Sequence, residues 1–271
     1  MSALVSPSGG SAAGPVVTTI AGAAARVLVN RPAARNALSP DVVDGLRAAV
    51  AAAAAADCSV MVIRGAGGTL SAGADLKHLR AIRHDPAALR AYITSIGDMV
   101  NEIADAAFVT VCVVEEYALA GGCEILLACD LAVVSEKARI GDRHLQYGLL
   151  PGAGGSVRLA RAVPPALARR LLFTGEMIDG AAAARAGLVS HAVPSGQVNA
   201  EAEALTQRLT GLSRSALIQM KRLYRTAVST DPGAAIENER ETLLRHLTQN
   251  PDAAEGLAAF AERRAPEWSR P

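Results

Sequence analysis

Short runs of apolar, often β-branched residues are separated along this chain by longer stretches with helical spacing. Runs of the first kind predict buried strands, because Val and Ile pack well on a pleated sheet. Gly22 lies between the first two runs and predicts a hairpin there. The predicted strands are residues 16–20, 26–29, 60–63, 109–114 and 131–134.

The stretches between these runs carry helix signals. Ser39-Pro40-Asp41 offers an N-cap with proline in the first turn, and apolar residues follow at helical spacing up to Val50. Strands that alternate with helices predict an α/β fold with crossover connections. Further helices are predicted over residues 86–96, 125–128, 155–161 and 166–173.

The pattern changes after about residue 200, because no further strand signal occurs. Asp231-Pro232 and Asn250-Pro251 are cap-plus-proline helix starts. The helices predicted in this part are residues 201–212, 214–228, 232–247 and 251–263. We therefore expect three parts: a disordered tail rich in Ser, Gly and Ala over residues 1–15, an α/β core over 16–200, and a helical region over 201–271.

Composition excludes several classes of function. With 51% hydrophobic residues, the chain has enough apolar side chains for a large core. Only 3% of residues are aromatic and the net charge is +1, which argues against a nucleic-acid partner. No apolar stretch is long enough for membrane insertion, and the N-terminus lacks the basic start of a secretory signal.

The cysteines favour a reducing compartment. The four cysteines form no CxxC pair and have no His cluster nearby: Cys58, Cys112, Cys123 and Cys129. Buried free thiols are favoured over disulfides or metal ligands. We therefore predict a cytoplasmic protein without a metal site.

Two glycine-bearing turns carry the candidate chemistry. Ala118-Leu119-Ala120-Gly121-Gly122-Cys123-Glu124 joins an apolar run to a helix, and Ser71-Ala72-Gly73-Ala74-Asp75-Leu76-Lys77 follows another apolar run. Gly121 and Gly122 leave room for a ligand to approach the backbone. The first N–H groups of a helix lack internal partners and can hold an oxyanion. Two such turns, with Glu124 behind one of them, suggest thioester enolate chemistry.

These turns belong to a set of segments that resembles the crotonase (enoyl-CoA hydratase/isomerase) superfamily. Their order and spacing cover roughly residues 16–268. Together they are a strong signal of the family and a weak signal of which reaction is run. The segments are residues 30–38, 71–77, 117–124, 129–132, 151–155 and 183–189.

The resemblance implies an architecture and two oxyanion positions. The implied fold is a spiral of ββα turns followed by a C-terminal α-helical oligomerisation region, which makes a homotrimer or a dimer of trimers. Ala74 falls at the first oxyanion position and Gly121 at the second, so their backbone N–H groups would polarise a thioester carbonyl. No cofactor is implied, because coenzyme A arrives as part of an acyl-CoA substrate.

The resemblance also assigns a set of coenzyme A contacts. Arg35 and Lys77 are candidate cations for its phosphates, although both also fit solvated surface residues. Arg263 and Arg264 resemble the end of the family's terminal motif and fit a phosphate contact or a helix-end cation equally well. The predicted substrate-binding residues are Arg35, Ala72, Ala74, Asp75, Leu76, Lys77 and Gly121.

The acid–base residues depart from the hydratase pattern. Glu124 matches one of two catalytic glutamates, but the second position, twenty residues later, is His144. Histidine can exchange protons near neutral pH, so His144 is predicted as catalytic or ligand-facing. Asp142 either orients His144 or replaces the glutamate after a shift of the loop. Glu115-Glu116 stands where the family usually has a glycine at the second position, and is predicted to be solvated or salt-bridged.

The sequence thus predicts an enoyl-CoA hydratase-type enzyme with Glu124 as acid/base. Two alternatives stay open. One is another crotonase reaction, such as isomerisation, C–C cleavage or thioester hydrolysis. The other is an acyl-CoA-binding protein with little catalysis, which the missing glutamate permits.

Overall fold

A six-stranded sheet forms the centre of the molecule, which the computed structural model describes over residues 14–269. Its strand order is β1-β2-β3-β4-β6-β9; β1 and β2 form an antiparallel hairpin and the other neighbours are parallel. A smaller sheet has the order β5-β7-β8. The strands are β1 (Val16–Ala21), β2 (Ala24–Val29), β3 (Val60–Gly65), β4 (Val109–Val114), β5 (Tyr117–Leu119), β6 (Leu131–Ser135), β7 (Arg139–Gly141), β8 (Ile178–Asp179) and β9 (His191–Val193).

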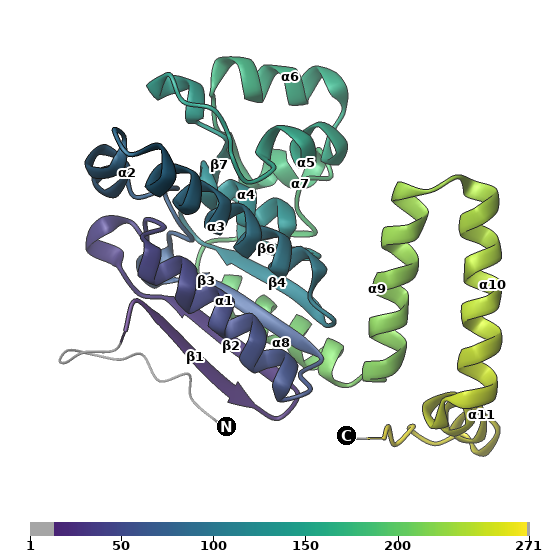
Figure 1. The fold of residues 1–271 in the computed structure, drawn as a ribbon. Helices are drawn as coiled ribbons and strands as arrows, with labels where there is room; N and C mark the ends of the chain where they lie inside the picture. The colour runs from purple at the N-terminus through teal and green to yellow at the C-terminus, as the bar shows by residue number, and fades with distance from the viewer. Residues whose placement is uncertain (1–13, 270–271) are drawn as a thin grey trace.

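Helices cover both faces of this sheet (Figure 1). The α-helices are α1 (Pro40–Ala55), α2 (Leu76–Ile82), α3 (Pro86–Asp105), α4 (Gly121–Ala128), α5 (Gly155–Ala162), α6 (Pro165–Thr174), α7 (Gly180–Arg185), α8 (Val198–Thr210), α9 (Arg214–Ser229), α10 (Pro232–Gln249) and α11 (Pro251–Glu262). Three 3-10 turns are η1 (Pro32–Ala34), η2 (Ala66–Gly68) and η3 (His144–Tyr147).

Alternate residues of each central strand enter two different cores. In β3, Met61 and Ile63 pack with the residues of α1 and α3, whereas Val60 and Val62 pack with those of α8. A parallel sheet buried on both faces needs a nearly continuous apolar sequence, which explains why these strands show as apolar runs. The helix α8 therefore covers the sheet, although the sequence groups it with the C-terminal helices.

Helices α9, α10 and α11 extend away from the sheet as an arm (Figure 1). The buried Lys221 holds this arm to the core: its Nζ donates to the Phe108 carbonyl at 2.9 Å and to Oδ2 of Asp130 at 2.7 Å. Apart from this root, the arm exposes many large apolar side chains. They are Met220, Tyr224, Val228, Ile236, Leu243, Leu244, Leu247, Leu257 and Phe260.

Most predicted elements occur in the structure. Some of the predicted N-cap residues accept hydrogen bonds from their helices, and one does not. Asp85 and Asp231 accept hydrogen bonds from the first turns of their helices, as expected for N-caps. Ser39 occupies the N-cap position of α1, but its buried hydroxyl has no hydrogen-bond partner within residues 14–269. The sequence missed the short strands β5, β7, β8 and β9. The predicted tail lies almost entirely outside the described residues.

Candidate active site

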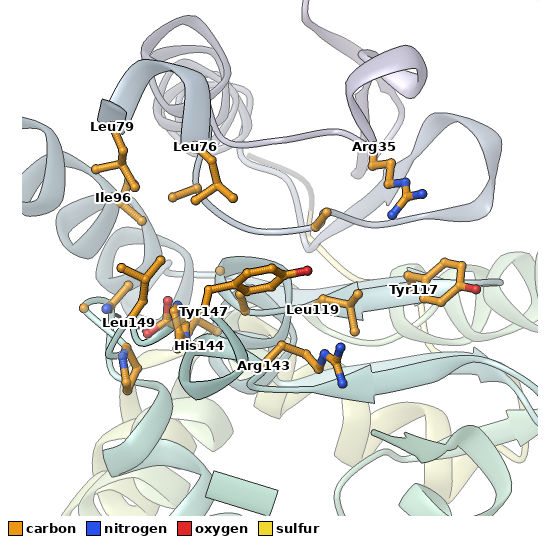
Figure 2. Close-up of a pocket in the computed structure, with 18 of the residues that line it drawn as sticks. Arg35, Leu76, Leu79, Ile96, Tyr117, Leu119, Arg143, His144, Tyr147 and Leu149 are labelled. Carbon is orange, nitrogen blue, oxygen red and sulfur yellow. Dashed lines mark hydrogen bonds between the residues drawn. The ribbon is translucent and has the colours of Figure 1, made fainter. Parts of the chain in front are cut away.

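A cavity of about 980 Å³ opens between the α2–α3 segment and the loops that follow β4 and β7. Figure 2 shows Leu76, Leu79 and Arg35 on one side of it, with His144, Tyr147 and Arg143 opposite. The two ends of the cavity differ: apolar side chains line one end, and Arg35 and Arg143 lie toward the other.

Backbone pairing brings the two glycine turns to this cavity. The stretch before Ala72 pairs with β5, because the Leu70 N–H donates to the Tyr117 carbonyl at 2.8 Å and the Leu119 N–H donates to the Ser71 carbonyl at 3.0 Å. Segments 47 residues apart in the sequence, paired at Ser71 and Ala118, thus run side by side as extended chain. The turns that follow each segment are placed next to one another.

The N–H groups of Ala74 and Gly121 are neighbours at the cavity wall. A Cβ added to Gly121 would lie 3.6 Å from the Ala74 nitrogen, and one added to Gly73 would lie 3.1 Å from the Gly121 nitrogen. Within residues 14–269, neither N–H has a hydrogen-bond acceptor. Two adjacent, unused donors form the geometry of an oxyanion hole.

Strained backbone orients the second donor. Ala120, the N-cap of α4, has φ 48° and ψ −118°, which a residue with a Cβ rarely adopts. Gly73 faces it with φ 103°, and a Cβ there would lie only 2.7 Å from that of Ala120. The two turns are therefore in contact, and only glycine fits at position 73.

The structure gives Gly122 a different role from the one predicted. A Cβ at Gly122 would lie 2.2 Å from the Ser71 carbonyl oxygen. This glycine thus permits the two loops to pack on each other, and the neighbouring backbone occupies the space that the sequence interpretation left for a ligand. A Cβ at Gly121 would similarly lie 2.8 Å from Cδ1 of Leu38.

Glu124 is a buried carboxylate in the first turn of α4 and lines the cavity. Its Oε1 accepts the backbone N–H groups of Ala153 at 2.8 Å and Gly155 at 2.9 Å. Burial raises the pKa of Glu124, while these two hydrogen bonds and the nearby His144 act in the opposite direction. A carboxyl with a raised pKa and one oxygen fixed is suited to exchange a proton with a bound molecule.

His144 lies on the same wall, at the start of η3 (Figure 2). Its Nδ1 lies 3.0 Å from Oδ1 of the buried Asp142, and the same oxygen accepts the His144 backbone N–H at 3.3 Å. Asp142 does not line the cavity. Of the two roles left open by the sequence, its contacts match the orientation of His144.

The predicted coenzyme A residues separate into two groups. Arg35, Ala72, Ala74, Leu76 and Gly121 line the cavity. The other two predicted residues, Asp75 and Lys77, do not.

Asp75 is engaged at the start of α2. Its carboxylate caps that helix and pairs with Arg31 at 3.2 Å, and its own N–H donates to the Tyr92 hydroxyl. Burial acts to raise the pKa of Asp75, but the hydrogen bond from the His78 N–H and the pairing with Arg31 outweigh it and lower this pKa. Lys77 is exposed in the first turn of the same helix.

The structure also shows the surroundings of Arg264, Glu115 and Glu116. Arg264 pairs with Glu255 and Glu262 in the C-terminal arm and does not line the cavity of its own chain. Glu115 accepts a hydrogen bond from Asn199 at 2.9 Å, as expected for a salt-bridged or solvated residue, whereas Glu116 lines the cavity mouth.

Several residues that build the site were missed. The fully buried Asn36, at φ 55°, donates to the Thr69 and Ala66 carbonyls and accepts the Arg31 N–H, which ties the loop after β3 in place. The Ala153 and Gly155 donors to Glu124 come from the Pro151–Gly155 turn, which the sequence identified only as a backbone turn beside the acyl pocket. An asparagine at positive φ gives no signal in sequence alone, because many asparagines lie in ordinary turns.

Within residues 14–269, no three His, Cys, Asp or Glu side chains are grouped so as to hold a metal ion. In the same residues, no helix is long and apolar enough to cross a membrane.

Comparison with known proteins assigns the chain to a family. The sequence model described as enoyl-CoA hydratase/isomerase matches residues 19–271. The chain belongs to the enoyl-CoA hydratase/isomerase family. The resemblance inferred from the six segments is therefore confirmed.

Individual relatives agree with this membership. A probable enoyl-CoA hydratase of Mycobacterium bovis is 33% identical over 244 residues, which cover 90% of this chain and 93% of that protein. The mitochondrial enoyl-CoA hydratase domain-containing protein 2 of Homo sapiens is 36% identical over 251 residues, which cover 89% of this chain and 84% of that one.

Solved structures confirm the predicted fold class. The crystal structure of an enoyl-CoA hydratase from Polaromonas sp. JS666 superposes with a TM-score of 0.89 at 30% identity and covers 94% of this chain and 99% of that one. The mixed α/β crotonase fold, with its helical C-terminal region, is thus the fold of this chain.

Proposed function

We propose that this enzyme adds water to a trans-2-enoyl-CoA to give a 3-hydroxyacyl-CoA. The thioester oxygen would lie between the N–H groups of Ala74 and Gly121, and Glu124 would exchange the proton at the reacting carbons. His144, on the same wall of the cavity as Glu124, would assist.

One observation carries this proposal: the Glu124 carboxyl stands one turn behind the unused Gly121 N–H, on the same short helix. Hydration of an enoyl thioester needs an oxyanion donor for the enolate and a proton-exchanging group near Cα. Both groups line one cavity in this chain. The rigid helix and the two N–H donors to Glu124 fix their separation.

The two ends of the cavity support an acyl-CoA as the substrate. One end is lined by aliphatic residues of α2, α3 and the loop after η3, which suit an uncharged hydrocarbon chain: Leu76, Leu79, Leu89, Ile93, Ile96, Leu149 and Leu150. The other end carries Arg35 and Arg143, whose guanidinium groups suit the phosphates of coenzyme A. The substrate would bring coenzyme A with it, and we propose no separate cofactor.

Turnover of crotonyl-CoA tests the reaction, and calorimetry with acetyl-CoA tests binding separately. We expect loss of the enoyl absorbance with formation of 3-hydroxybutyryl-CoA. Binding without any turnover would leave a non-catalytic acyl-CoA-binding protein. Release of free coenzyme A would instead identify thioester hydrolysis, and a 3-enoyl product would identify isomerisation.

We further propose that the chain assembles as a homotrimer or a dimer of trimers. The apolar side chains exposed on α9, α10 and α11 support self-association, because exposed apolar patches of this extent mark interaction surfaces. Arg264 would then approach a neighbouring subunit, where a coenzyme A contact stays a proposal.

A further inference from the structure

The pair formed by Asp142 and His144 carries a more specific inference, which rests on the proposed function. Asp142 is buried, and its Oδ1 lies 3.0 Å from Nδ1 of His144. A carboxylate accepts hydrogen bonds and cannot donate them, so Nδ1 must carry the proton in this contact. The other ring nitrogen, Nε2, is then left as an acceptor in the neutral imidazole.

Nothing in the described chain uses that second nitrogen. His144 lines the cavity, and its Nε2 has no hydrogen-bond partner within residues 14–269. A deprotonated imidazole nitrogen, held by a buried carboxylate and facing a ligand cavity, is arranged as a proton acceptor.

The surroundings bring few competing charges to the ring. Glu124 is the acidic group on the facing helix, and the Arg143 guanidinium turns away to the Gly175 carbonyl at 3.1 Å. The elements in contact with η3 and α4 carry further charged or titratable groups, and within residues 14–269 none of them forms a hydrogen bond or ion pair with the His144 ring. They are Cys123 on α4, Tyr147 on η3, Tyr117 on β5, Arg158 and Arg161 on α5, Arg169 and Arg170 on α6, Glu176 after α6, and Arg90, Tyr92, Asp98, Glu102 and Asp105 on α3. Arg170 and Glu176 pair with each other, and Arg158 bonds to the Ala153 carbonyl and Asn101.

We propose that Asp142 is a positioning residue that holds His144 in the Nδ1–H tautomer, so that Nε2 is the base which activates water. Two residues of one loop, Asp142 and His144, thereby replace the second glutamate of the hydratase pattern. In this division of roles, His144 accepts a proton from the water, and Glu124 donates a proton to Cα.

The step balances with these groups alone. Nε2 takes a proton from water as the water oxygen bonds to Cβ, and the C=C π electrons move to form an enolate held by the Ala74 and Gly121 N–H groups. The carboxylic acid form of Glu124 then gives its proton to Cα as the enolate collapses. Transfer of the proton from the His144 imidazolium back to the Glu124 carboxylate, through solvent, restores both groups.

The variant Asp142→Asn tests this role. Asparagine can still accept the His144 N–H groups and keep the turn, but it removes the negative charge that stabilises an imidazolium. We expect kcat for crotonyl-CoA to fall by about 10-fold or more, with KM nearly unchanged, because a weaker base transfers the proton less well. We also expect the pH profile of kcat to change in this variant, because the carboxylate charge beside the proposed base is gone.

A matched loop variant separates positioning from loop integrity. Gln146→Ala removes the hydrogen bond from η3 to the Thr174 carbonyl at 2.8 Å without touching Asp142 or His144. It should leave the pH profile as in the parent enzyme. If Gln146→Ala and Asp142→Asn change kcat alike and neither shifts the pH profile, the role of Asp142 is structural only and the proposal is overturned.

Nitrogen-15 NMR of the imidazole decides the tautomer independently of turnover, with the His144 signal assigned through His144→Gln. An Nδ1–H signal in the parent supports the proposal, and an Nε2–H signal overturns it. If the parent binds crotonyl-CoA without hydrating it, the proposed function fails, while the tautomer measurement still decides the role of Asp142. If the parent hydrates crotonyl-CoA and Asp142→Asn matches it, only the present inference fails.

Discussion

The backbone N–H of Gly155 donates to Oε1 of Glu124 at 2.9 Å, and Gly155 has no side chain at the point where Glu124 and Asp142 come together. A Cβ placed there would lie 2.8 Å from Oδ2 of Asp142 and 3.2 Å from Cγ of Glu124. One residue of the Pro151–Gly155 turn therefore sets the position of both acidic groups.

Replacing this glycine should disturb the chemistry more than the fold. In Gly155→Ala, the added methyl would push the Glu124 and Asp142 carboxyls from their places, and displacements of this size can cost about 10²-fold in rate. We expect kcat for crotonyl-CoA to fall by that order while acetyl-CoA still binds in calorimetry. Gly256→Ala is the matched control, because its added Cβ meets only the Trp268 ring at 3.8 Å. Equal kcat in both variants would contradict the prediction.

Glu124→Gln should lower activity and change how stability depends on pH. Because burial raises the pKa of Glu124 in the folded protein, the folded state binds this proton more tightly than the unfolded state does. The parent therefore loses stability as pH rises from the unfolded pKa through the raised folded pKa, and the glutamine variant does not. We expect the Tm of the variant minus that of the parent to be larger at about pH 8 than at about pH 5.

Turnover measured on the same Glu124→Gln protein completes this test. General acid–base catalysis typically contributes about 10²–10⁴-fold to the rate, so the rate of hydration should fall by about 10²-fold or more. A variant as active as the parent would show that the carboxyl is not the acid/base. A Tm difference that shrinks with rising pH would contradict the raised pKa.

Bulk at the apolar end of the cavity should shorten the preferred acyl chain. Ile93 lines the cavity opposite the Pro151–Gly155 turn, and its Cγ2 lies 3.3 Å from the position of a Cβ on Gly152. In Ile93→Trp, we expect kcat/KM for dodecenoyl-CoA to fall about 10-fold, equivalent to losing the burial of roughly two methylene groups. Crotonyl-CoA has a much shorter acyl chain to place at the apolar end, so it should be affected less. Val157→Trp is the control, because Val157 is exposed on α5 and does not line the cavity; an equal effect in both variants would contradict the assignment.

The C-terminal arm should hold the assembly together. Light scattering should give three or six times the 27.8 kDa mass of one chain. Leu244→Glu places a charge among the exposed apolar residues of α10 and should reduce this mass, because burying an unpaired charge is costly. Glu241→Gln, on the same helix, removes a charge and should leave the mass unchanged. A parent that is monomeric at micromolar concentration would contradict the proposed trimer.

The sequence by itself determined the α/β architecture and the two glycine turns proposed to carry the chemistry. The strands of the central sheet are buried on both faces, so they show as continuous apolar runs. The cap-plus-proline starts at Asp231 and Asn250 mark helices whose predicted bounds lie within two residues of those observed. The two glycine turns were predicted as candidate sites because glycine turns next to apolar runs are local patterns, and the family resemblance singled out Ala74, Gly121 and Glu124 within them. The short strands β5 and β7 left no such pattern, because three residues are too few to show a period.

Only the tertiary structure decided which groups meet. The Ala74 and Gly121 N–H groups become neighbours through pairing of the segment at Ser71 with β5, and Glu124 is held by donors about 30 residues further along the chain. Gly122 is required by contact with Ser71, and Asp75 turns to cap α2, although both lie in the motifs that predicted ligand contacts. The physical reason is that sequence patterns report local conformation and burial, whereas the partner of each N–H and carboxylate is set by packing between distant segments.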